Sequence, residues 1–313
     1  MLEEIVICKI VIAVVCILLF FAVATYAQSS HRALHSDASH IGDWHAMGLS
    51  PCAWSVPLLK PDHSLDVDQT IDLLKQAGFR CEIAVVGGNP ESWKDFKRFA
   101  AAANSANIDL WPVILPPSEG SSQPYGHDYV GWAEAFAKLS LEYPHVRGLN
   151  IDDLDQGESR ETFTREYVCQ IYSTKRKINP KLLFVPTIYD LDRKVADRLA
   201  GCVDGVWLWW VNLEKATGLP SFLENSKLAA AGRFPIYGGV YAHSTSWHEQ
   251  GNPVPHVFQQ TLESTCEHAD GTMIWNISLA PSDPLLEITK RFSPGSSAPL
   301  AGRCGQSPGM LAN

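Results

Sequence analysis

The sequence is short of basic residues and has no run of them. Lys and Arg number 25 against 34 Asp and Glu, so the 313-residue chain carries a formal net charge of −9. A nucleic-acid partner would call for a basic patch, and we expect none. Hydrophobic residues make up 46% of the chain, enough for one large core or two smaller ones.

Signatures of metal and cofactor chemistry are also missing. No Cys-x-x-Cys pair occurs, which disfavours a zinc knuckle. The turn from Trp54 to Pro57 is not a Gly-rich phosphate loop. The one His-x-x-x-His spacing, His31 to His35, lies in a polar stretch. We therefore expect no metal and no cofactor; a metal held by His243, His248 and Asp190 is the less favoured alternative.

The N-terminus reads as an export segment. Residues 5–24 form an almost unbroken apolar run, and Thr25-Tyr26-Ala27 before Gln28 fits a signal-peptidase site. The run is also long enough to span a bilayer. Residues 1–27 are therefore expected to be a signal peptide or a membrane anchor. The protein would be secreted, periplasmic or on the outer surface, and it would meet a membrane only through this segment, if uncleaved.

The rest of the chain divides into three parts. Residues 28–42 are polar and resemble a linker, residues 43–292 carry regular periodicity, and residues 293–313 are rich in Ser, Pro and Gly and are expected to be irregular. In an exported chain an even number of cysteines permits disulfides, although small buried residues are an equal alternative. The six beyond the leader are Cys52, Cys81, Cys169, Cys202, Cys266 and Cys304.

Within residues 43–292, strand-like apolar runs alternate with helical patterns. The expected strands are Ala46–Trp54, Arg80–Val86, Asp109–Leu115, Val146–Ile151, Leu182–Ile188, Gly205–Val211, Pro235–Tyr241 and Thr272–Ile277. The expected helices are Leu65–Gln76, Glu91–Ala106, Tyr129–Leu141, Glu161–Lys177, Leu191–Ala200, Leu219–Ala231, Val254–His268 and Leu285–Phe292. Eight alternations over about 250 residues predict an α/β fold, a single (β/α)8 TIM barrel. A doubly wound open sheet is the alternative.

Barrel enzymes keep their chemistry where the strands end. Here those positions hold aromatic, amide and carboxylate side chains and almost no Lys or Arg. Such a set suits a neutral, hydroxylated ligand, because a phosphate site would use Arg, Lys or a glycine nest. The residues expected to bind substrate are Trp54, Asn89, Asp155, Tyr189, Asp190, Trp209, Tyr241, His243 and Asn276.

The fourth strand ends in an adjacent carboxylate pair, Asp152-Asp153. Strand alternation points Asn150 and Asp152 into the barrel, and a turn at the strand end would bring Asp153 over the rim. Close carboxylates have split pKa values, so one can stay protonated near neutral pH and act as an acid. The alternative is that Asp153 and Asp155 belong to a solvated turn.

The run Gly148-Leu149-Asn150-Ile151-Asp152-Asp153 resembles the fourth-strand motif of barrel glycosidases that act on N-acetylhexosamines. In the chitinase-like family this strand ends in a catalytic Glu, and this chain has Leu154 there. The adjacent aspartates are more similar to the O-GlcNAcase-like family. That resemblance implies that Asp152 orients the substrate acetamido group and that Asp153 is the general acid/base.

These features predict an enzyme, an exported glycoside hydrolase acting on a carbohydrate. The catalytic residues would be Asp152 and Asp153. The nucleophile would be the substrate acetamide or a second carboxylate, for which Asp190 is the candidate. The alternative is a non-catalytic carbohydrate-binding or cell-envelope barrel.

Overall fold

A computed structural model describes residues 51–244 and 251–292 of the chain. The expected leader, the linker, the C-terminal tail and His248 lie outside these residues. None of the described helices is long and apolar enough to cross a membrane. The barrel domain is therefore the part of the chain for which the structure tests the sequence predictions.

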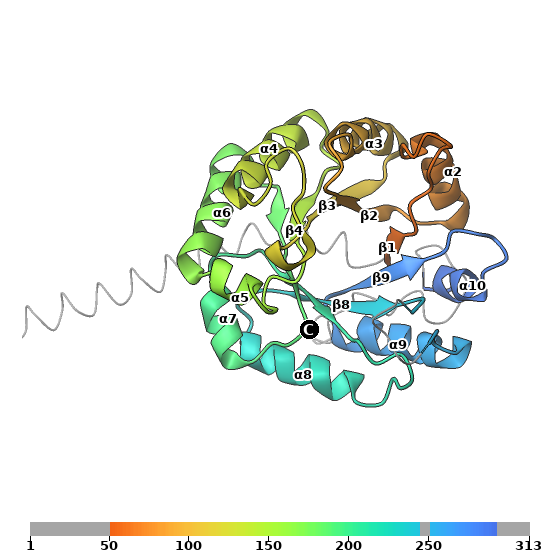
Figure 1. The fold of residues 1–313 in the computed structure, drawn as a ribbon. Helices are drawn as coiled ribbons and strands as arrows, with labels where there is room; N and C mark the ends of the chain where they lie inside the picture. Colours follow the sequence, from red (N-terminus) through yellow and green to blue (C-terminus); the bar gives the residue numbers. More distant parts are fainter. Residues whose placement is uncertain (1–50, 245–250, 293–313) are drawn as a thin grey trace, which may run out of the picture. The chain divides into compact units, whose positions relative to one another are not determined.

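Parallel strands alternate with helices along the described chain (Figure 1). The strands are β1 (Cys52–Ser55), β2 (Cys81–Val86), β3 (Asp109–Ile114), β4 (Gly148–Ile151), β5 (Leu183–Phe184), β6 (Thr187–Ile188), β7 (Val206–Trp209), β8 (Ile236–Tyr241) and β9 (Gly271–Ile277). The helices are α2 (Val67–Ala77), α3 (Ser92–Ala106), η2 (Pro117–Glu119), α4 (Tyr129–Glu142), α5 (Ser159–Thr162), α6 (Arg165–Ile178), α7 (Arg193–Leu199), α8 (Leu219–Ala230), α9 (Pro255–His268) and α10 (Pro284–Lys290).

The strands form a (β/α)8 barrel, as the alternation predicts. Their order is β5-β4-β3-β2-β1-β9-β8-β7-β6. The two end members, β5 and β6, are halves of the expected strand Leu182–Ile188, interrupted at Val185-Pro186. Proline has no N–H for the ladder. The ring still closes there, because Val185 N–H donates to Leu149 O (3.0 Å) and Trp207 N–H donates to Pro186 O (2.9 Å).

The helices form where an apolar face follows a capping residue. In α2 the buried positions Val67, Ile71 and Leu74 recur at helical spacing. Asp66 caps this helix by accepting from the Gln69 N–H (3.2 Å). The apolar helix faces pack on the outward side chains of the strands and make one continuous layer of core around the ring.

Tryptophans fill the inside of the barrel, and glycines on the adjacent strands make room for them. A Cβ on Gly148 of β4 would lie 1.9 Å from the Trp111 ring, and one on Gly239 of β8 would lie 2.4 Å from the Trp209 ring. The rings of Trp111 and Trp207 pack at a tilt, with centroids 5.6 Å apart, and both are almost fully buried. The barrel interior around these rings is thus a packed core.

This packing predicts that Gly148→Ala destabilises the protein strongly. Neither the strand backbone nor the buried indole of Trp111 can move away from the added methyl. We expect a loss of at least ~1–3 kcal/mol, the usual cost of overpacking, measured by urea denaturation. Gly87→Ala is the control, because its Cβ would meet only Ser92 Oγ at 3.6 Å. Equal midpoints for the two variants would contradict the close packing.

Two disulfides lie within the described residues. Cys52–Cys81 joins the first residues of β1 and β2, and Cys169–Cys202 joins α6 to the segment after α7. Each cross-link restricts the unfolded chain across about thirty residues, which stabilises the folded state by a few kcal/mol. Cysteine pairing of this kind is typical of exported proteins.

Candidate active site at the barrel mouth

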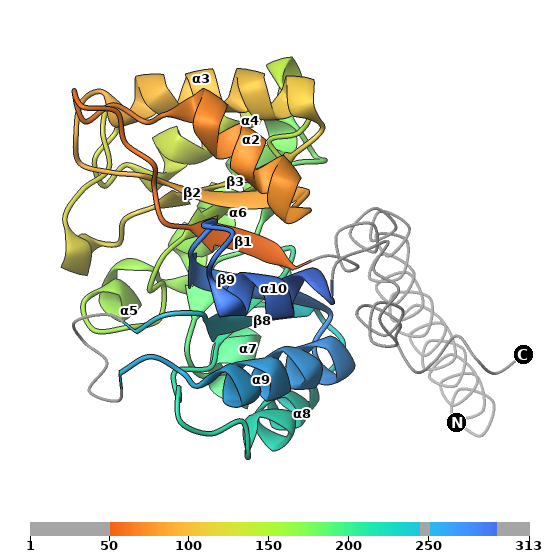
Figure 2. The same cartoon turned by 90° about the vertical axis from the view of Figure 1, so that its right-hand side faces the viewer.

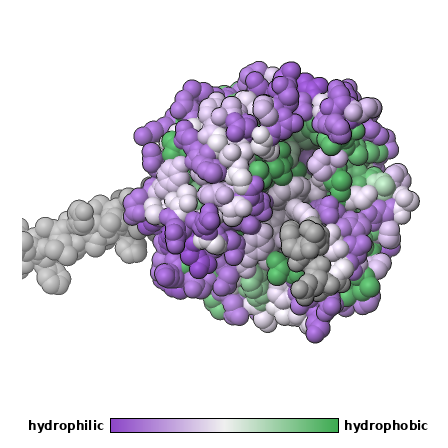
Figure 3. Space-filling model, in the orientation of Figure 1, coloured by the Kyte–Doolittle hydropathy of each residue, from purple (hydrophilic) through white to green (hydrophobic). Residues whose placement is uncertain are grey.

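The strand C-termini meet at one end of the barrel, here called the mouth. The segments carrying η2 and α5 follow β3 and β4, and Figure 2 shows both at the left-hand end of the barrel. Figure 3 views this end directly. Its rim is mostly hydrophilic, and apolar residues lie toward its middle. Inside the mouth Val85 of β2 is 41% exposed, so solvent reaches an inward-facing apolar position.

The aspartate pair lies where β4 ends, between its two neighbours. Asp152 N–H donates to Ile114 O of β3 (3.1 Å), and Leu154 N–H donates to Thr187 O of β6 (3.0 Å). Asp153 has a left-handed backbone with φ of 44°, which few residues other than Gly adopt. The expected turn at the strand end is therefore present, and it brings the second carboxylate out of strand alternation.

Neighbouring residues fix the orientation of the pair. Asn150 points into the barrel, as predicted, where its amide donates to Val185 O (2.6 Å) and contacts the Thr187 hydroxyl. Asp153 N–H donates to Asp152 Oδ1 (3.1 Å). One carboxylate oxygen of Asp153, Oδ1, is buried without a hydrogen-bond partner among the described residues. Buried polar atoms are normally paired, so this oxygen is available to a ligand.

Burial makes both carboxyls unusually basic. The pKa of Asp152 lies well above its ordinary value because the group is deeply buried and because Asp153 and Glu119 add negative charge. Burial also raises the pKa of Asp153, and a hydrogen bond from Tyr189 partly offsets that rise. A carboxyl that holds its proton near neutral pH can serve as a general acid.

Tyr189 links the pair to the opposite wall of the mouth. Its hydroxyl is within hydrogen-bonding reach of both the Asp153 carboxyl and the Tyr241 hydroxyl. Burial and the nearby carboxylates raise the pKa of both tyrosines, so both stay neutral hydrogen-bond donors. Tyr189 and Tyr241 are two of the predicted substrate-binding residues, and the structure brings them to the pair.

The wall of the mouth across from the pair is aromatic. Trp54 of β1 packs edge-on against Trp209 (centroids 6.0 Å) and Trp275 (6.3 Å), and Tyr241 contacts both of these rings. Trp54 and Trp275 are partly exposed, whereas Trp209 is only 2% exposed and supports the others from beneath. Aromatic rings of this kind stack on the apolar faces of sugars.

A β-bulge shapes this wall. Trp54 pairs with Trp275 and Ser55 with Ile277, so Asn276 is the extra residue of the bulge, with φ of 58°. Bulges re-aim side chains next to functional sites. Asn276 was predicted to bind substrate, and the structure places it half-buried at the rim beside Trp275.

Other predicted residues are held elsewhere. Asp155 is buried and ion-paired with Arg198 of α7 and with Arg160 (3.4 Å), so it braces the loop after β4. Asn89 is exposed and accepts from Glu91 N–H (2.9 Å) where α3 begins. His243 contacts Asp283 through Nε2 (2.8 Å), and Asp190 is exposed. The structure does not bring these four to the aspartate pair.

Glu119 is a mouth residue that sequence reasoning missed. It ends η2, in the loop after β3, and its charge acts on Asp152 and Tyr241. Partial burial of the Glu119 carboxyl and the charge of Asp153 raise its pKa, although the residue as a whole is exposed. The loop has no strand or helix periodicity that would have placed this residue. The one available signal was its position just beyond a strand end.

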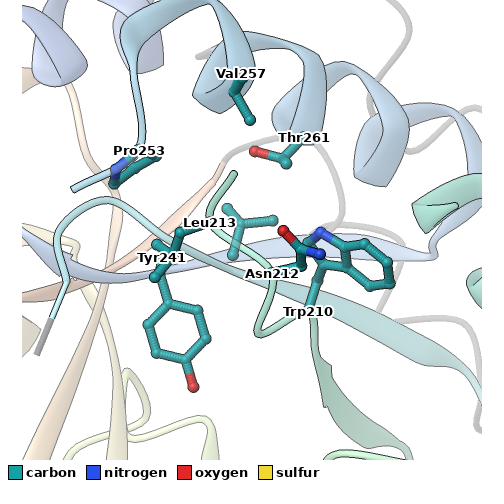
Figure 4. Close-up of a pocket in the computed structure, with 8 residues that line it drawn as sticks. Trp210, Asn212, Leu213, Tyr241, Pro253, Val257 and Thr261 are labelled. Carbon is teal, nitrogen blue, oxygen red and sulfur yellow. The ribbon is translucent and has the colours of Figure 1, made fainter. Parts of the chain in front are cut away.

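A small pocket lies behind the aromatic wall. It is lined by Trp210, Asn212, Leu213, Val240, Tyr241, Pro253, Val257 and Thr261. In Figure 4 the ring of Tyr241 points away from Val257 and Thr261 of α9. Trp210 packs at a tilt against Phe222 of α8 (centroids 5.5 Å apart), on the outer side of the barrel. The pocket therefore lies outside the barrel, and the acids lie inside it.

Several solved structures with the same fold are glycoside hydrolases. They include a family 39 glycoside hydrolase from Bacteroides cellulosilyticus, with 14% identity over 79% of this chain, 64% of that one and a TM-score of 0.55. An endo-1,4-β-mannanase from Eisenia fetida has 9% identity over 82% and 94% of the two chains and a TM-score of 0.54. Cel5A of Thermotoga maritima, solved with cellobiose, has 14% identity over 80% and 98% and a TM-score of 0.57.

At these identities the likeness concerns the fold alone, a (β/α)8 barrel that this chain shares with those glycoside hydrolases. The chain spans less than two thirds of the family 39 enzyme. No protein-family model matches the sequence, and no curated protein matches it. The choice of reaction therefore depends on the residues at the mouth.

Proposed function

We propose that the protein is a glycoside hydrolase and that the glycosidic bond is cleaved at the mouth. Asp153 is the general acid/base, and Asp152 is the neighbour that orients the substrate and stabilises charge. The observation that carries the proposal is the Asp153 carboxyl itself. It has a raised pKa, one of its oxygens is buried with no hydrogen-bond partner among the described residues, and it faces a partly exposed aromatic wall.

The surroundings favour a neutral sugar over an anionic ligand. Among the described residues, no Lys or Arg forms an ion pair with Asp152, Asp153 or Glu119. An anionic substrate would meet three carboxyl groups and no countercharge. A sugar brings hydroxyls that can pair with these oxygens and apolar ring faces that can pack on Trp54 and Trp275.

The substrate class follows from the resemblance of the β4 motif. Because Asp152-Asp153 resembles the O-GlcNAcase-like pair, we propose N-acetylhexosaminides as the first substrates to test. Two disulfides and the leader-like N-terminus support an exported protein that meets its substrate outside the cytoplasm.

One observation favours a second candidate, a carbohydrate-binding barrel without catalysis. Leu154 occupies the position of the chitinase-like catalytic Glu, and it is fully buried. Two assays distinguish the hydrolase from the binding protein: turnover of aryl glycosides, including aryl N-acetylglucosaminides, and binding of the corresponding free sugars. Release of the aryl group supports the hydrolase. If free sugars quench the tryptophan fluorescence but no aryl glycoside is hydrolysed, the protein is a carbohydrate-binding barrel and the hydrolase proposal fails.

The hydroxyl of Tyr189 gives a pH-dependent prediction. It donates to the charged form of Asp153 and so lowers the pKa of that carboxyl. In Tyr189→Phe the pKa rises, and the acid keeps its proton to higher pH. We expect the alkaline limb of the rate profile to move up by on the order of one pH unit.

The exposed Tyr125 supplies the control for this measurement. Tyr125→Phe removes a phenol hydroxyl from the loop after β3 and should leave the profile in place. If the alkaline limb of the rate profile lies at the same pH in Tyr189→Phe as in wild type, or at a lower pH, the ionisation of Asp153 does not determine that limb.

A further inference from the structure

Glu119 comes from the strand next to the aspartate pair. β3 and β4 are paired through Val113 with Asn150 and Ile114 with Ile151. η2 follows β3 directly, and it contacts α5, the helix that follows the pair. The two neighbouring strands therefore bring Glu119 and Asp153 to the mouth from separate loops.

The loop that carries Glu119 is fixed at several points. Leu115 N–H donates to Ser122 Oγ (3.0 Å), and the Tyr129 hydroxyl donates to Leu115 O (2.9 Å). Gln123 N–H reaches across to Gly87 O at the end of β2 (3.1 Å). These bonds hold the segment against the ends of β2 and β3, so Glu119 has a defined place at the rim.

Glu119 is exposed to water and has no hydrogen-bond or ion-pair partner in the part of the chain that the structure describes. The charge of Glu119 nevertheless raises the pKa of Asp152, and the charge of Asp153 raises the pKa of Glu119. It is thus a free carboxylate with solvent access, close to the proposed acid.

The aspartate pair cannot supply both carboxylates of a hydrolysis in which water attacks the anomeric carbon directly. The two residues are adjacent in sequence, and Asp153 N–H donates to Asp152 Oδ1, so both approach from the end of β4. Hydrolysis assisted by two carboxylates needs them on opposite faces of the sugar ring. The second one must come from another loop.

We propose that Glu119 is the general base that activates the attacking water, an assignment that rests on the proposed glycoside hydrolase function. The Glu119 carboxylate takes one proton from water as the water oxygen bonds to the anomeric carbon. The bond from that carbon to the leaving oxygen breaks, and Asp153 gives this oxygen its proton. Glu119 ends protonated and Asp153 ionised, and exchange with solvent restores both. The product has inverted configuration.

Glu119→Gln is the first test, with Glu158→Gln as the matched control, since Glu158 is exposed where α5 begins. On the aryl glycoside that wild type hydrolyses best, Glu119→Gln should lower kcat by roughly 10²–10⁴-fold. Glu158→Gln should match wild type. Urea midpoints confirm that each variant is folded. A folded Glu119→Gln with wild-type kcat overturns the assignment.

Two further readouts identify the role. Proton NMR of the first-formed sugar should show inversion, and retention would overturn the base assignment. Azide should restore turnover to Glu119→Ala as a glycosyl azide, because azide attacks without a base, and failure of rescue counts against the proposal. If wild type hydrolyses no glycoside, the proposed function fails and this inference with it. If wild type is active and only the Glu119 results disagree, the inference alone fails.

Discussion

Asp153→Asn is expected to lower kcat on unactivated glycosides by roughly 10²–10⁴-fold while sugar binding survives. The amide keeps the size of the carboxyl and can still accept a hydrogen bond from Tyr189, but it cannot give a proton to the leaving oxygen. With a 2,4-dinitrophenyl leaving group the loss should be much smaller, because that group departs without protonation.

Asp72→Asn, on the outer surface of α2, is the control for the chemistry of the substitution. It should leave turnover and binding unchanged. An Asp153→Asn protein that is as active as wild type on unactivated substrates would remove Asp153 from the mechanism. Equal losses on activated and unactivated substrates would show that its role is not proton donation.

Glu82→Gln is expected to change how stability depends on pH. Glu82 is 3% exposed on β2, and it shares strand parity with Ala84 and Val86, which face the helices. Ser55 donates to its Oε1 through the backbone N–H (3.2 Å) and the hydroxyl (2.5 Å), while Oε2 is buried without a partner among the described residues. Burial raises the pKa of Glu82 to about 8.

The sign of the effect follows from linkage. The folded protein holds this proton up to about pH 8, whereas the unfolded chain releases it near the ordinary value of 4.5. Stability is therefore full below pH 4.5 and is lost as the pH rises toward 8, at up to about 1.4 kcal/mol per pH unit. The total is on the order of several kcal/mol.

Urea denaturation of wild type and Glu82→Gln between pH 5 and 9 measures this loss. Glutamine cannot ionise, so the variant should gain stability relative to wild type as the pH rises. Glu158→Gln, at an exposed site, should follow the wild-type curve. Parallel curves for wild type and Glu82→Gln would show that Glu82 is already ionised in the folded protein.

The ring itself could be predicted from sequence because local patterns determine it. Apolar runs and amphipathic helices alternate eight times, and each element has its own periodicity. The break at Pro186 and the left-handed turn at Asp153 depend on contacts with neighbouring strands, which no local pattern records.

Side chains on loops were harder to place than those on strands. Tyr189, Tyr241 and Trp54 could be assigned to the mouth because each stands at a strand end. Asp155 was expected to bind substrate, but its ion pair with Arg198 is a long-range contact between the β4 loop and α7. Glu119 could not be assigned to the mouth from sequence, because its position depends on tertiary hydrogen bonds that fix the loop after β3.

The central claim is that the Asp152–Asp153 pair at the mouth acts on a glycosidic bond. A crystal structure of Asp153→Asn with the glycoside that wild type turns over tests this most directly. We predict the glycosidic oxygen within about 2.6–3.2 Å of the side chain at position 153, the hydrogen-bond reach of a general acid. The sugar ring should lie against Trp54 and Trp275. A sugar bound outside the mouth, or one whose glycosidic oxygen faces a different acid, would contradict the account.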